Sequence, residues 1–170
     1  MSLLNKARGI KLVAILTAGL AMAACAKNAA EDVAGGGGLG GYGSGAATPG
    51  SQQDFAVNVG DRVFFDSDST ELSSTAQGTL DKQARWLQQY SRYSFTVEGH
   101  ADERGTREYN FALGARRAEV VKEYLIARGI AAARVRTISY GKERPVAVCN
   151  DISCWSQNRR AVTVLGGGQS

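Results

Sequence analysis

The sequence predicts an α+β fold, in which a mixed four-stranded sheet is built in the order β-α-β-α-β-β and the helices pack on one face. One observation predicts this fold, and two more predict how the chain is divided around it. Strand-like and helix-like hydrophobic patterns alternate from about residue 55 onward. The stretch 35–50 contains nine glycines in sixteen residues, so it is unsuited to a core. An uncharged run near the N-terminus resembles an export signal. We therefore expect a removed signal peptide (1–24), a tether (25–54), one domain (55–166) and a flexible tail (167–170).

The strands are predicted where β-branched and aromatic residues cluster between turn residues. The four expected strands are Arg62–Phe65, Tyr93–Val97, Val135–Tyr140 and Ala161–Leu165. The interleaved helices make the sheet mixed, but its strand order does not follow from the sequence.

Two helices are predicted from apolar residues spaced three and four apart. The first begins at Ser74, which forms a capping-box pattern with Gln77. The second begins after Thr106 and ends near Gly129, a residue type that suits the position after a helix. Between the second strand and this helix, residues 99–105 are expected to form a loop.

The N-terminal segment has the layout of an export signal. Residues 1–11 carry three cations, and Leu12–Ala24 is an uncharged run of thirteen residues, shorter than the about 20 needed to span a bilayer. The sequence Met22-Ala23-Ala24-Cys25 resembles the lipobox of bacterial lipoproteins, which implies diacylglycerol on Cys25. Ala26 in place of Asp favours sorting to the outer membrane. The alternative is an ordinary secreted protein with an accidental cysteine at this position.

The charge pattern argues against a nucleic-acid partner. The formal net charge of +4 includes three cations of the signal segment, so the mature chain carries about +1. Acidic residues are scattered among the basic ones, which leaves no concentrated basic surface.

The strongest candidate site lies at the start of the second predicted helix. Arg117 falls on the same helix face as Leu113, Val121 and Leu125, where a guanidinium needs an anionic partner or ligand. Asp102 lies just before this helix. Together they would match a zwitterion, with an ammonium on Asp102 and a carboxylate on Arg117. An internal ion pair explains the pattern equally well, and Arg116 is a competing cation for the same pocket.

The same stretch resembles the peptidoglycan-binding signature of OmpA-like domains. The matching positions are Asp102, Leu113-Gly114, Arg117-Ala118, Val121 and Leu125, and the departures are Ala101 and Gly114. The resemblance implies that the ligand is the meso-diaminopimelate of an uncrosslinked stem peptide. It also implies Asp68 and the Ser67 backbone in the same pocket, with Asn110 and Leu113 as further candidates on the helix.

The strings GHADERGT, SYGKERP and NRRAV, with the lipobox and tether, resemble the subfamily of peptidoglycan-associated lipoproteins of the Tol–Pal system. This resemblance implies a non-enzymatic lipoprotein, anchored in the outer membrane with its domain facing the periplasm. Such a protein binds peptidoglycan, ties the outer membrane to the cell wall and docks TolB and other Tol proteins, with roles in envelope integrity and cell division. A second hypothesis is a cell-wall hydrolase or transferase that uses Asp102 and Glu103.

Cys149 and Cys154 are expected to form a disulfide, because an exported protein meets an oxidising compartment. Their four-residue separation differs from that of a redox Cys-x-x-Cys pair. The single histidine, His100, is expected to form hydrogen bonds in a loop, since it has too few neighbouring ligands for a metal site. No metal or cofactor is predicted.

Overall fold

The computed structural model describes residues 47–166, and these form the α+β domain that the sequence predicts. The predicted signal peptide, the lipidation residue Cys25, the tether as far as residue 46 and the tail 167–170 lie outside the described residues. Within 47–166 no helix is both long enough and apolar enough to cross a membrane.

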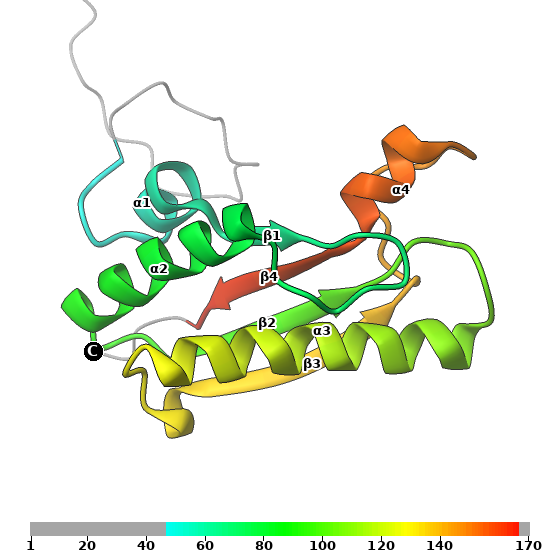
Figure 1. The fold of residues 1–170 in the computed structure, drawn as a ribbon. Coiled ribbons are helices and arrows are strands. Elements are labelled where there is room, and N and C mark those ends of the chain that lie inside the picture. Colours follow the sequence, from blue (N-terminus) through cyan, green and yellow to red (C-terminus); the bar gives the residue numbers. More distant parts are fainter. Residues whose placement is uncertain (1–46, 167–170) are drawn as a thin grey trace, which may run out of the picture. The chain divides into compact units, whose positions relative to one another are not determined.

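The sheet has the strand order β1-β4-β2-β3, with β2 parallel to β3 and β4 antiparallel to both of its neighbours. Figure 1 shows helices α2 and α3 on the same face of this sheet. The strands are β1 (Arg62–Phe64), β2 (Phe95–His100), β3 (Val135–Gly141) and β4 (Arg160–Leu165). The helices are α1 (Gln52–Asp54), followed by a π-helical turn (Phe55–Gly60), then α2 (Ser74–Gln89), α3 (Arg107–Ala127) and α4 (Ile152–Asn158), with a 3₁₀ turn at Ala132–Arg134.

The core lies between the helices and the sheet. The side chains of Leu80, Leu87, Val97, Val121 and Leu125 are at most 1% exposed. They come from the apolar positions that predicted the two helices and the second strand, because these spacings place the residues on one helix face or one side of a strand.

The helix boundaries confirm one predicted cap and correct the other. The Thr106 hydroxyl accepts a hydrogen bond from the Tyr109 N–H at 3.2 Å, and Gly129 follows α3 with φ +91°. Helix α2, however, is capped by Ser73, whose hydroxyl accepts from the Ala76 N–H. The capping box predicted at Ser74 is therefore wrong by one residue, since either of two adjacent serines could supply the oxygen.

The folded region begins before the predicted boundary at residue 55. The Trp86 indole N–H donates to the Asp54 carboxylate at 2.8 Å, and the Tyr93 hydroxyl donates to the Gly50 carbonyl at 2.9 Å. Residues assigned to the tether therefore belong to the domain, because they complete the hydrogen bonding of an aromatic cluster at the end of α2.

Two glycines let α3 approach β2 closely. A Cβ atom added to Gly99 would overlap the carbonyl oxygen of Gly114, and one added to Gly114 would lie 2.5 Å from the Ser139 hydroxyl. The second strand begins at Phe95 rather than at Tyr93 and continues to His100, which pairs with Gly141, so the predicted loop is wrong at residues 99 and 100. The close approach of α3 to β2 at Gly99 and Gly114 brings the helix face that carries Arg117 against the carboxyl end of β2.

Candidate functional site

An open pocket of about 230 Å³ lies where the β1–α2 loop, the β2–α3 loop and the first turns of α3 meet. It is lined by Ser67, Asp68, Asp102, Arg104, Gly105, Tyr109, Asn110 and Leu113. Five of the six residues predicted to bind the ligand therefore line one pocket. The sixth, Arg117, is not part of its lining.

Arg117 lies behind the pocket wall and is completely buried. Its Nε donates to the Ser69 carbonyl at 2.9 Å, and its two terminal nitrogens donate to the carbonyls of His100 (2.8 Å) and Asp66 (3.0 Å). Burial, together with repulsion from Arg159, lowers the pKa of Arg117 to about 10, so the group remains charged at neutral pH.

In the described structure Arg117 and Asp102 have different hydrogen-bond partners, and their predicted joint binding of a zwitterion stays a prediction. The guanidinium of Arg117 makes no hydrogen bond to Asp102, and it fastens the β1–α2 loop to the end of β2. Three backbone carbonyls accept hydrogen bonds from the guanidinium. The apolar pattern of the helix face gives no indication of these partners, because every residue carries a backbone carbonyl. Arg116, the competing cation, is exposed and does not line the pocket.

Asp102 is also buried, at 7% exposure, and it receives several donors. Its Oδ1 accepts from the backbone N–H (3.1 Å) and the Nε (3.0 Å) of Arg104, while its Oδ2 accepts from the Nη2 of Arg104 (2.7 Å) and the Nη1 of Arg159 (3.4 Å). Burial alone would raise the pKa of Asp102, but the bonds from Arg104, with Arg159 adding to them, outweigh it and hold the pKa below its usual range.

Arg104 is the charged pocket residue that the sequence interpretation missed. Its side chain is 44% exposed, and besides the Asp102 contacts it donates to the Ser67 hydroxyl at 2.8 Å. Its position two residues after Asp102 in a glycine-flanked loop was the available signal. The pocket therefore presents a guanidinium beside a carboxylate, although the cation is not the predicted one.

Asp68 supplies a second carboxylate at the pocket mouth. It is the one non-glycine residue within 47–166 with a positive φ (57°), a conformation that Asp tolerates better than most residues. The Tyr109 hydroxyl donates a hydrogen bond to Asp68, and this bond raises the pKa of Tyr109. Both carboxylates line the pocket, and that of Asp68 is exposed whereas that of Asp102 is largely buried.

The remaining predicted residues shape the pocket. Asn110 is 2% exposed, and its Nδ2 donates to the Arg104 carbonyl at 2.7 Å, which fixes the loop that carries Arg104. Leu113 is 4% exposed and forms an apolar part of the wall.

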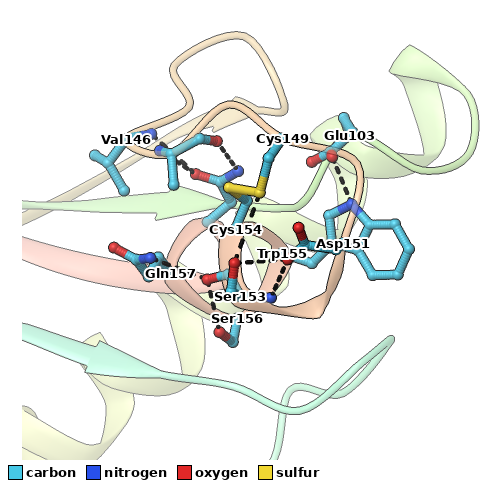
Figure 2. Close-up of a disulfide and its surroundings, with 11 residues drawn as sticks. Glu103, Val146, Cys149, Asp151, Ser153, Cys154, Trp155, Ser156 and Gln157 are labelled. Carbon is cyan, nitrogen blue, oxygen red and sulfur yellow. Dashed lines mark hydrogen bonds between the residues drawn. A yellow bond between two sulfur atoms is a disulfide. The ribbon is translucent and has the colours of Figure 1, made fainter.

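The disulfide prediction is confirmed, and the histidine prediction is wrong. Cys149 and Cys154 are bonded in the segment between β3 and β4 (Figure 2). His100 ends β2, and neither ring nitrogen has a hydrogen-bond partner among the described residues; Glu98 is 3.8 Å from Nε2. The described part of the chain holds no group of three metal-ligating side chains.

The comparisons with known proteins agree with this architecture. A model of the OmpA family matches residues 64–159. The chain is 64% identical over 161 residues to the "Peptidoglycan-associated lipoprotein" of Rhizobium meliloti (strain 1021), covering 95% of this chain and 89% of that one. It is 45% identical over 122 residues to the protein of the same name from Pseudomonas aeruginosa, covering 71% and 72%.

Solved structures show the same fold. The crystal structure of the peptidoglycan-associated lipoprotein from Burkholderia pseudomallei aligns with a TM-score of 0.61 at 40% identity, covering 62% of this chain and 90% of that one. The C-terminal domain of Helicobacter pylori MotB aligns with a TM-score of 0.58 at 22% identity, covering 62% and 84%, which shows similarity of fold alone.

Proposed function

Because the chain belongs to the OmpA family and, within it, to the peptidoglycan-associated lipoproteins, we propose that it binds peptidoglycan non-covalently through the pocket described above. The observation that carries this proposal is the pairing of an accessible carboxylate, Asp68, with a half-exposed guanidinium, Arg104, in one open pocket. Opposite charges in the lining of one pocket suit a small zwitterion rather than a simple anion or cation.

The ligand that fits this chemistry is the free end of a stem peptide that contains meso-diaminopimelate. Its ammonium would bind Asp68, and its carboxylate would bind Arg104, whose Nη1 donates no hydrogen bond within the described residues. Ser67, Asn110 and Leu113 would complete the wall, Asp102 would orient Arg104, and Arg117 would hold the β1–α2 loop in place. The roles of Asp102 and Arg117 thus become supporting ones.

We propose that this binding ties the outer membrane to the cell wall as part of the Tol–Pal system, through a lipid on Cys25 after removal of residues 1–24. The domain would then face the periplasm, and TolB and other Tol proteins would be its protein partners. The resemblance to relatives named as peptidoglycan-associated lipoproteins supports this assignment.

A hydrolase that uses Asp102 and Glu103 is disfavoured. A general acid needs a raised pKa, whereas that of Asp102 is lowered, and its oxygens already accept hydrogen bonds from two arginines. The Glu103 carboxylate likewise already accepts a hydrogen bond from the Trp155 indole N–H.

The test is calorimetric titration of the soluble domain with two stem tripeptides, one ending in meso-diaminopimelate and one ending in lysine. Lysine lacks the second carboxylate, so its peptide loses a charge-assisted hydrogen bond and should bind about 10- to 100-fold more weakly. Asp68→Asn should weaken binding of both peptides, and Arg116→Ala, on the exposed face of α3, is the matched control. Equal affinity for the two peptides would overturn the zwitterion mechanism.

A further inference from the structure

Helix α4, which the sequence did not predict, contacts the β2–α3 loop through Trp155. It belongs to the segment between β3 and β4 that the disulfide closes, and the Asp151 carboxylate caps it by accepting from the Ser153 N–H at 2.8 Å. At its other end, the Asn158 side chain accepts from the Val146 N–H at 2.9 Å and donates to the Ala147 carbonyl at 2.8 Å. The helix is therefore fixed at both ends.

Trp155 extends from α4 to two consecutive residues of the β2–α3 loop. Its indole N–H donates to the Glu103 carboxylate, as Figure 2 shows. The guanidinium carbon of Arg104 lies 4.2 Å from the centre of the indole ring. One aromatic side chain thus contacts both residues that follow Asp102.

These contacts restrict the guanidinium of Arg104 on more than one side. Asp102 and the Ser67 hydroxyl hold its donating edge, and the Trp155 ring covers its face. An arginine side chain has many rotamers, and holding it in one orientation before the ligand arrives reduces the entropy lost on binding.

We propose that Trp155 is a positioning residue that sets the affinity of the pocket for the ligand carboxylate by fixing Arg104. The inference rests on the proposed function, since it concerns the same stem-peptide zwitterion. Trp155 itself does not line the pocket, so its effect on binding passes through Arg104.

The first test compares Trp155→Ala, Trp155→Phe and Gln157→Ala in the disulfide-intact domain. Gln157 is an exposed control on the same helix, and Figure 2 shows it on the opposite side of α4 from Trp155. Calorimetry with the diaminopimelate tripeptide should show about tenfold weaker binding for Trp155→Ala. Trp155→Phe keeps a ring face and should lose only about threefold, and Gln157→Ala should match the wild type. Unfolding midpoints recorded for each variant separate a loss of affinity from a loss of fold.

The second test asks whether the effect depends on Arg104. In an Arg104→Ala background, Trp155→Ala should cause no further loss of affinity, because the group that it positions is gone. Tryptophan fluorescence gives an independent signal: emission should change when the tripeptide binds, and the change should disappear in Trp155→Phe, since Trp86 is buried away from the pocket.

Three outcomes would overturn the inference. Wild-type affinity in Trp155→Ala would refute it while leaving the proposed function intact. An equal fold-loss with and without Arg104 would show that Trp155 acts on the fold rather than on the guanidinium. Absence of tripeptide binding by the wild-type domain would refute the proposed function itself, and the inference with it.

Discussion

Replacing Arg117 should lower the stability of the domain, and any effect on ligand binding should follow from that loss, because Arg117 does not line the pocket. Arg117→Ala removes three charge-assisted hydrogen bonds and leaves the carbonyls of Asp66, Ser69 and His100 facing a cavity. Each buried carbonyl without a partner costs about 1–3 kcal/mol, and water entering the cavity would satisfy some of them. We therefore expect a loss of about 4 kcal/mol in the free energy of unfolding.

Arg117→Lys should fall between the alanine variant and the wild type. An ammonium keeps the charge but cannot direct three donors along the planar fork that the three carbonyls accept from, so we expect a loss of about 2 kcal/mol. Arg116→Ala is the matched control, because Arg116 is exposed and its removal should change stability by less than about 0.5 kcal/mol.

The assay is urea unfolding of the domain followed by circular dichroism, with tripeptide affinity measured under conditions in which each variant is folded. The supporting role predicts that stability and affinity fall together, because release of the β1–α2 loop also displaces Asp68. If Arg117→Ala unfolds at the same urea concentration as Arg116→Ala but fails to bind, Arg117 contacts the ligand directly and the reasoning is wrong.

Three further predictions concern other parts of the chain. Cys25→Ser should prevent acylation and move the mature protein to the soluble periplasmic fraction; a variant that stays membrane-bound after a salt wash would contradict the lipid anchor. Reduction of the Cys149–Cys154 disulfide, which closes a short loop, should lower the free energy of unfolding by about 2 kcal/mol. Urea unfolding with and without reductant measures this loss, and an unchanged midpoint would contradict a stabilising role of the disulfide. Burial, then repulsion from Arg160 and Arg144, lowers the pKa of His100 to about 4, so the unfolded chain takes up a proton near pH 6.5 and the folded chain does not. The free energy of unfolding should therefore fall between pH 6.5 and 4, by up to about 3 kcal/mol, and fall less in His100→Gln; identical pH dependence of the two proteins would exclude this cause.

Local patterns were sufficient to predict the four strands and the two long helices of the domain. The spacing of Leu80 and Leu87, and of Val121 and Leu125, predicted the helices and their buried faces, because one face of each helix must be apolar to cover the sheet. Helix α4 was not predicted. It spans seven residues, too few for a periodic pattern, and is fixed by a disulfide and by Asn158.

The site was only partly predictable from the sequence, because the hydrogen-bond partners of its arginines depend on how the chain folds. The signature around Asp102 identified the right loop and helix, and five of the six predicted residues do line one pocket. The partners of the two arginines could not be read from the sequence. Arg117 is satisfied by backbone carbonyls, which every residue type offers equally. The two-residue spacing of Asp102 and Arg104 permits a turn in which the Asp side chain accepts from the later N–H, but it does not show that the guanidinium folds back onto the same carboxylate.

The sequence by itself determined the fold class, the positions of the strands and long helices, the disulfide and the acidic loop before α3, because each depends on the residue types within one short segment. Only the tertiary structure decided the strand order, the burial of Arg117 behind the pocket and the stacking of Arg104 on Trp155. These features join segments far apart in the chain. Which donor meets which acceptor there depends on how closely α3 approaches β2 at Gly99 and Gly114, and so on packing rather than on local pattern.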